Sequence, residues 1–224
     1  MPSIETLVIF SIAALLMNLS PGPSNLYVMA RSISQGVSGG ATATGGLALG
    51  GLVHVIAAAS GLSAIFLYSP SVYFVMKIAG ACYLIYLGVG YFKSGKSELE
   101  YLSVQKTREH IDALTARKIL AQSFWVEVLN PKTALFFLAF LPQFVDVTRS
   151  DTTTQFLILG MIVTLSAIPC DLTVAYFGGR VGEWMNNNES VVWWLNKISG
   201  SIMIGVGGFV ALDLISNGET DLCC

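Results

Sequence analysis

Long stretches without charged side chains alternate with short polar segments along this chain. Residues 6–30, 38–92, 119–145, 152–179 and 191–212 are uncharged or nearly so. A helix that spans the hydrocarbon core of a bilayer needs about 20 consecutive apolar residues. The run at 38–92 is therefore long enough for two helices, which we separate at the turn that contains Pro70. The pattern predicts an all-α integral membrane protein with six transmembrane helices, at residues 5–30, 39–68, 71–93, 118–145, 152–179 and 191–213.

The polar segments are too short to form a second domain. Residues 94–117 are the longest of them and are interpreted as a loop, so residues 1–224 form a single transmembrane domain with a short C-terminal tail. The amino terminus has no basic stretch before its apolar run and no small-residue cleavage site. We therefore interpret it as a retained first helix rather than a signal peptide.

The composition agrees with a chain dissolved in lipid. Hydrophobic residues make up 54% of the chain and charged residues 12%, whereas soluble domains carry about 25% charged residues. A soluble enzyme, a disordered chain and a disulfide scaffold are thereby excluded. The net charge of −2 provides no basic surface for nucleic acid.

Motifs for metals, cofactors and nucleotides are missing from the sequence. Its two histidines, one of them in the polar loop, and the two scattered cysteines of the predicted helices, Cys82 and Cys170, do not form a metal-ligand cluster. No glycine-rich phosphate loop follows a predicted strand. We therefore expect no enzyme, no metal and no cofactor, and a transport activity that runs on an ion gradient rather than on ATP.

The distribution of basic residues predicts the orientation in the membrane. Cytoplasmic loops carry an excess of Lys and Arg. The opposite loops and both termini contain only Arg149. The loops after the first, third and fifth predicted helices contain Arg31, Lys93, Lys96, Lys106, Arg108, Arg117, Lys118 and Arg180. Both termini are therefore expected on the periplasmic side, and residues 94–117 in the cytoplasm.

The two halves of the chain resemble each other. A shift of 110 positions places Leu19-Ser20-Pro21 on Leu129-Asn130-Pro131, and a shift of 120 places Lys77-Ile78-Ala79-Gly80 on Lys197-Ile198-Ser199-Gly200. Each half, about 1–93 and 118–215, has three spans, so the halves cross the membrane in opposite directions. Inverted repeats of this kind are typical of secondary transporters, which move one half against the other around a site near the midplane.

Proline interrupts the first and fourth predicted helices at matched positions. Interrupted helices in lipid are tolerated where they face protein or a water-filled cavity, and the helix segments that restart there direct free N–H groups at an anion. A kink that serves only packing is the alternative. The candidate substrate-binding residues at the two breaks are Asn18, Ser20, Pro21, Gly22, Pro23, Ser24, Asn130, Pro131 and Lys132.

Four ionisable residues lie deep in the predicted helices. Lys132 is near the bilayer centre, where a charge costs about 2.5–3.5 kcal/mol, so it either binds an anionic group in a wet cavity or pairs with Glu127 or Asp171. His54, Glu127 and Asp171 are candidates for the coupled proton or for the substrate ammonium. The alternatives are a structural ion pair for the acids and a hydrogen-bonded packing role for His54. The pair Gly46 and Gly50 predicts a contact between helices of one chain rather than a dimer interface.

The sequence resembles the LysE/RhtB family of bacterial amino-acid exporters over almost its whole length. The resemblance rests mainly on Ser20-Pro21-Gly22-Pro23, and on Asn130-Pro131-Lys132-Thr133 continuing through Phe140-Leu141-Pro142-Gln143-Phe144. It implies a protein of the inner membrane that exports amino acids or close derivatives, in exchange for protons. The direction of transport is implied by the resemblance alone.

One difference within the family bears on the substrate. The resemblance implies that members of the branch that exports lysine and arginine carry one acidic residue in the second helix and another shortly after the Asn-Pro of the fourth helix. Here those regions carry His54 and Ala134-Leu135-Phe136. The chain is thus similar to the RhtB-like branch for neutral substrates, with threonine, homoserine, homoserine lactone, leucine and cysteine-like compounds left open.

The alternatives are a transporter of another small solute or cation and a membrane redox protein. A redox protein would need cysteines at equivalent positions of the two repeats, whereas Cys82 aligns with Ile202 and Cys170 with Ser60. The expected partners are an amino acid, protons and lipid. Whether a homo-oligomer forms and what Cys223 and Cys224 do are left open by the sequence.

Overall fold

The computed structural model describes residues 4–20, 22–62, 114–146 and 151–187, together with scattered positions within 75–92 and 190–212. These residues are helical, with no strand among them, which confirms the all-α fold. In chain order the elements are α1 (Ile4–Leu19), α2 (Pro23–Ala57), the π-helical turn η1 (Ala58–Leu62), α6 (Ala116–Val128), α7 (Pro131–Leu135), the π-helical turn η3 (Phe136–Phe140), the 3-10 turn η4 (Leu141–Phe144) and α8 (Thr152–Asn187).

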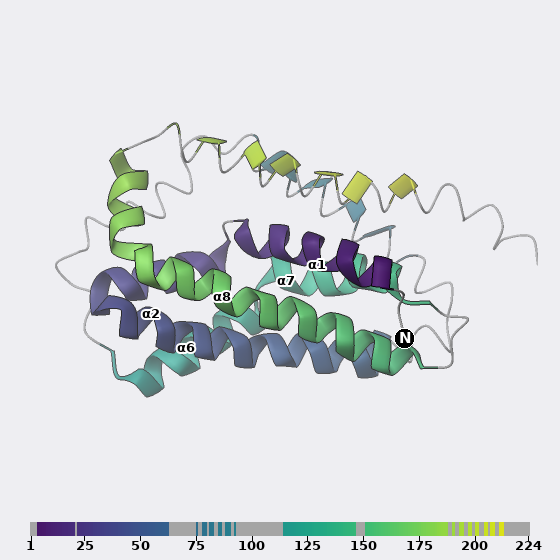
Figure 1. The fold of residues 1–224 in the computed structure, drawn as a ribbon, viewed down its shortest axis with the longest axis horizontal. Helices are drawn as coiled ribbons and strands as arrows, with labels where there is room; N and C mark the ends of the chain where they lie inside the picture. Colours follow the sequence, from purple (N-terminus) through teal and green to yellow (C-terminus); the bar gives the residue numbers. More distant parts are fainter. Residues whose placement is uncertain are drawn as a thin grey trace, which may run out of the picture.

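Helix α2 consists of two helical segments that fold back on each other at Gly36. This glycine has φ 71° and ψ −174°, in the left-handed region that side chains disfavour. A Cβ atom on Gly40 would lie 1.9 Å from Oγ of Ser32, although residues eight apart in a straight helix are separated by about 12 Å. Figure 1 shows the chain turning back at the left edge of the molecule. The reversal lies between the predicted spans 5–30 and 39–68.

Two further breaks occur where prolines predict them. α1 ends at Leu19 and α2 begins at Pro23, and α6 ends at Val128 before α7 begins at Pro131. The α6 helix and the segment Pro131–Phe144 meet at 41°. Pro23 and Pro131 each stand at the start of a helix, where the missing N–H has no helical partner to lose. The interruption of the first and fourth predicted helices is thus confirmed.

Part of the predicted membrane topology lies within the described residues. Pro23–Leu62 and Thr152–Gly178 are long and apolar enough to cross a bilayer, as is the bent pair of α6 and Pro131–Phe144 if it counts as one span. The predicted spans 71–93 and 191–213 fall largely outside the described residues, as do residues 94–113 and the C-terminal tail. The count of six helices and the inverted repeat therefore stay predictions.

Small residues and aromatic rings hold the helices together. α2 packs against both α6 and α8, and Gly46 and Gly50 lie directly against α6 of the same chain. This confirms the contact within one chain that their spacing predicts. Phe10 of α1 packs against Phe136 and Phe140 of η3, with ring centroids 6.2 Å apart in both pairs.

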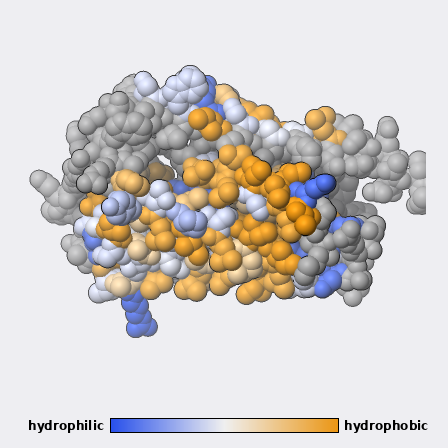
Figure 2. Space-filling view, in the orientation of Figure 1, coloured by the Kyte–Doolittle hydropathy of each residue, from blue (hydrophilic) through white to orange (hydrophobic). Residues whose placement is uncertain are grey.

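The outer surface of the bundle is apolar. Large hydrophobic side chains are exposed along α1 and α8, among them Ile9, Leu165 and Tyr176. Figure 2 shows such side chains gathered over the middle of the face that α8 and α2 present, with hydrophilic ones towards its ends. Exposed apolar surface of this extent is typical of contact with lipid.

Candidate functional site

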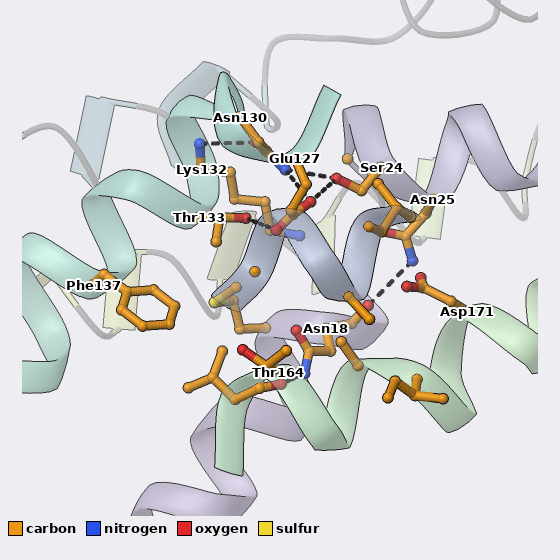
Figure 3. Close-up of a pocket in the computed structure, with 18 residues that line it drawn as sticks. Asn18, Ser24, Asn25, Glu127, Asn130, Lys132, Thr133, Phe137, Thr164 and Asp171 are labelled. Carbon is orange, nitrogen blue, oxygen red and sulfur yellow. Dashed lines mark hydrogen bonds between the residues drawn. The ribbon is translucent and has the colours of Figure 1, made fainter. Parts of the chain in front are cut away.

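A small polar cavity lies where the two interrupted helices meet. It has a volume of about 40 Å³ and is lined from α1, α2, α6, α7, η3 and α8. That volume accommodates about three water molecules, so the helices close tightly around it in this conformation. Figure 3 shows the lining side chains that are polar or charged: Asn18, Ser24, Asn25, Glu127, Asn130, Lys132, Thr133, Thr164 and Asp171.

The carboxylate of Glu127 accepts hydrogen bonds from three side chains. Ser24 donates its hydroxyl to Oε2, and Thr133 donates to Oε1 over 2.8 Å. Nδ2 of Asn130 lies 3.5 Å from Oε2 and donates to Oγ of Ser24 over 2.8 Å. Hydrogen bonds to an ionised group are about twice as strong as neutral ones. These donors, two of which the sequence assigns to the substrate, bind a carboxylate of the protein itself in this conformation.

Lys132 lies at the end of α1. Its side chain is 7% exposed, and its Nζ donates to the backbone carbonyl of Ser20, directly after that helix. A Cβ atom on Gly22 would lie 3.4 Å from Nζ, so the ammonium group also lies against the start of α2. A cation stabilises a helix C-terminus through the exposed carbonyl groups there. The backbone N–H of Lys132 is itself occupied by Oδ1 of Asn130, at 3.0 Å.

Asp171 differs from Glu127 in its surroundings. It comes from the middle of α8, is 6% exposed and lines the cavity. Among the described residues, no hydrogen-bond donor and no cation within ion-pair distance reaches its carboxylate. Figure 3 shows this carboxylate on the side of the cavity where Asn25 lies.

His54 contacts the backbone of a cavity residue but does not itself line the cavity. Its Nε2 lies 2.9 Å from the backbone oxygen of Glu127, and its ring centroid is 5.6 Å from that of Phe137. The carbonyl of Glu127 has no donor four positions later, because Pro131 lacks an N–H; besides His54 it accepts from the N–H of Asn130, over 3.0 Å. Because a carbonyl only accepts, Nε2 carries the hydrogen. This contact fits the packing alternative for His54.

The remaining predicted residues divide between the cavity and its surroundings. Asn18 lines the cavity and donates to the carbonyl of Val163 and to Oγ of Ser166, at 3.1 and 3.0 Å, which joins α1 to α8. Ser20 contributes its carbonyl, and Gly22 and Ser24 line the cavity. Pro23 and Pro131 are exposed and shape the helix starts from outside. Pro21 lies outside the described residues.

Three polar lining residues are absent from the sequence-based candidates: Asn25, Thr133 and Thr164. Asn25 donates to the carbonyl of Asn18 over 3.2 Å, so it bridges the break between α1 and α2. The sequence offers a signal for Thr133, because this residue directly follows the predicted break at Asn130-Pro131-Lys132. Thr164 carries no such signal, because α8 contains other hydroxyl side chains, among them Ser166 and Thr173.

Comparison with known proteins identifies the family of this chain. The family described as LysE type translocator matches residues 15–214. The chain is 28% identical to a homoserine/homoserine lactone efflux protein of Salmonella typhi, over 90% of this chain and 94% of that protein. It is 27% identical to a leucine efflux protein of Enterobacter sp. (strain 638), over 90% and 93%. An uncharacterized membrane protein of Bacillus subtilis is 31% identical, over 87% and 92%.

No solved structure matches the chain significantly. The family match covers most of the sequence and includes both helix breaks. The chain therefore belongs to the LysE-type translocator family and is a membrane transporter rather than an enzyme.

Proposed function

We propose that this protein exports small neutral amino acids or close derivatives across the bacterial inner membrane in exchange for protons. The similar efflux proteins are named for homoserine, homoserine lactone and leucine; threonine and cysteine-like compounds also fit the proposal. The observation that carries it is the buried cavity between two helix breaks, which contains one basic and two acidic side chains within an apolar bundle.

The chemistry of the cavity suits a zwitterion. A substrate carboxylate would face the start of α2, where Gly22 leaves the first turn without a side-chain cap, and the Lys132 ammonium beside it. A substrate ammonium would face the acidic side chains. The rest of the lining is apolar and includes Met17, Leu47 and Phe137, a surface for a neutral side chain.

The interrupted helices also favour alternating access. A cavity of about 40 Å³ is too small for an amino acid, so the helices around it have to move apart to admit one. Helix segments separated by breaks can move relative to each other without losing internal hydrogen bonds. The matched breaks near Ser20 and Asn130 support a cycle in which the two predicted repeats move against each other, with both termini in the periplasm.

The proposal is tested by counterflow in liposomes that contain the purified protein. Radiolabelled threonine, leucine, cysteine and lysine are compared with and without an imposed pH gradient. Lys132→Ala is the test variant, and Lys118→Ala, at an exposed position of α6, is the matched control. We expect uptake of at least one neutral amino acid that responds to the gradient, persists in Lys118→Ala and is lost in Lys132→Ala. Transport of lysine alone contradicts the neutral branch, and no flux from folded protein contradicts the function.

A further inference from the structure

The charges in the cavity do not balance. Among the described residues that line it, the ionisable groups that face one another are Glu127 from α6, Lys132 from α7 and Asp171 from α8, while α1 and α2 contribute the neutral Asn18, Ser24 and Asn25. Lys132 offsets one of the two acids. If both acids are ionised, the cavity carries one surplus negative charge, and one further cation neutralises it.

The contacts of Glu127 and Asp171 show which of the two carboxylates lacks groups that stabilise its negative charge. Glu127 has three side-chain donors at its carboxylate, and these stabilise its ionised form. The side chain of Asp171 is only 6% exposed, and no donor from the described residues reaches its carboxylate. A buried carboxylate without donors is costly in its charged form and is neutralised by a proton or by a paired cation.

From this geometry we propose that Asp171 is the exchange site of the transporter: its carboxylate binds either one proton or the ammonium group of the substrate, and never both. The inference rests on the proposed function and assigns the coupling step within it. Glu127 remains ionised throughout as the fixed partner of Ser24, Asn130 and Thr133, and His54 keeps its bond to a backbone carbonyl.

The step balances in charge and protons. Protonated Asp171 and an R–NH3⁺ group give an Asp171 carboxylate paired with R–NH3⁺, and the O–H proton of Asp171 passes to water on the side to which the cavity is open. On the opposite side the order is reversed: the substrate leaves, and a proton from that side takes its place. One proton therefore moves inwards for each amino acid that moves outwards.

The experiment measures protons released on binding to the purified full-length protein in detergent. Leucine and threonine serve as probes, with binding followed by equilibrium dialysis of the labelled amino acid. Proton release is followed with a pH-indicator dye in weak buffer. We expect about one proton per amino acid bound. The dissociation constant should fall about tenfold for each unit by which the pH rises, over the pH range in which Asp171 is protonated in the empty protein. N-acetylleucine, which has no ammonium group, should release no proton.

Four variants locate the exchange. Asp171→Asn should lose binding by at least tenfold, and Asp171→Glu should keep proton release. Glu127→Gln should bind more weakly, yet still release about one proton per substrate bound. Asp151→Asn is the matched control: Asp151 is exposed, its Oδ1 accepts from the N–H of Thr154 at the start of the same helix, and Asn fills that capping role equally well. It should bind and release protons as the wild type does.

The possible results separate the two proposals. Binding by Asp171→Asn at wild-type affinity overturns the assignment, as does loss of proton release in Glu127→Gln. If Asp171→Asn does not fold, as judged by gel filtration, the proton stoichiometries of Glu127→Gln and Asp171→Glu decide alone. Wild-type protein that binds amino acids without releasing protons contradicts only this inference, whereas wild-type protein that binds none contradicts the proposed function.

Discussion

The contact between α2 and α6 leaves no room for a side chain at Gly46. A Cβ atom there would lie 1.9 Å from Oγ of Ser123, 3.1 Å from its Cβ and 2.5 Å from the backbone oxygen of Leu120. The adjacent Gly45 would place its Cβ no closer than 4.0 Å to Cδ2 of Leu120. The two glycines belong to one helix and differ in what faces them, so Gly46→Ala and Gly45→Ala form a matched pair.

The magnitude follows from the backbone contact. Ser123 can change its rotamer, but the Leu120 carbonyl belongs to the helix itself. Close carbon–oxygen contacts lie at about 3.3–3.6 Å, so the two helices must separate by about 0.8 Å to accommodate the Cβ of Gly46→Ala. Overpacking of this kind costs about 1–3 kcal/mol. Both variants gain the roughly 1 kcal/mol by which Ala exceeds Gly in a helix, and this gain cancels in the comparison.

Thermal unfolding in detergent, followed by gel filtration of the heated protein, compares the two variants. We expect Gly45→Ala to be as stable as the wild type or more so, and Gly46→Ala to be less stable than Gly45→Ala by about 1–3 kcal/mol. Adding Ser123→Gly to Gly46→Ala should restore only part of the loss, because the carbonyl of Leu120 remains. Equal stability of the two alanine variants would refute the reasoning, and full rescue by Ser123→Gly would refute the role of the carbonyl.

Three further changes test other parts of the structure. His54→Ala removes one of two donors to the carbonyl of Glu127, which still accepts from the N–H of Asn130 over 3.0 Å, and should lower the unfolding free energy by about 0.5–1.5 kcal/mol. His54→Gln keeps a side-chain donor and should lose less; pH-driven uptake should persist in both variants, and its loss in both would contradict a packing role. Gly36→Ala should destabilise by about 1–3 kcal/mol through the combination of positive φ and extended ψ, which only glycine adopts readily, because no atom lies within 4 Å of the added Cβ; a melting temperature equal to the wild type would contradict this. Gln155→Leu removes a buried side chain whose amide makes two hydrogen bonds to the backbone of Asp146, at 2.9 and 3.0 Å. It should lower the free energy of unfolding by about 0.5–1.5 kcal/mol for each bond lost, and the melting temperature with it; an unchanged melting temperature would contradict a stabilising role for this amide.

The sequence predicts the breaks of this fold well because their causes are local. Pro23 and Pro131 lack the N–H that would continue a preceding helix, so each favours a break. A proline does not end every helix, because Pro169 lies within α8. The reversal at Gly36 likewise falls in the short segment between two predicted spans. Uncharged length and proline position are properties of a single segment, so they can be interpreted before any tertiary contact is known.

The sequence does not predict the partners of the ionisable residues, because those partners lie far away along the chain. Glu127 takes a donor from Ser24, 103 positions away, and Lys132 reaches the carbonyl of Ser20, 112 positions away. His54 has the right chemistry for a proton carrier, yet it donates to the main chain 73 positions away. These roles depend on how helices are placed against one another, which the pattern of a single helix does not contain.

One contact is compatible with the inverted repeat that the sequence predicts. The shift of 110 positions pairs Gly22 with Lys132, and in the structure the side chain of Lys132 lies directly against Gly22. Residues exchanged by a two-fold axis meet only where that axis passes. The two helix breaks therefore adjoin at the position where a pseudo-two-fold axis would relate the halves.

The small volume of the cavity has a consequence for measured affinities. A conformation that holds about three waters cannot hold an amino acid, so only the fraction of molecules that is open binds. The apparent dissociation constant is the intrinsic one divided by that fraction, so a protein that is about 1% open binds about a hundredfold more weakly than its open form. Substitutions that favour the open form would then tighten equilibrium binding while slowing turnover, because the transporter must pass through the closed form in every cycle.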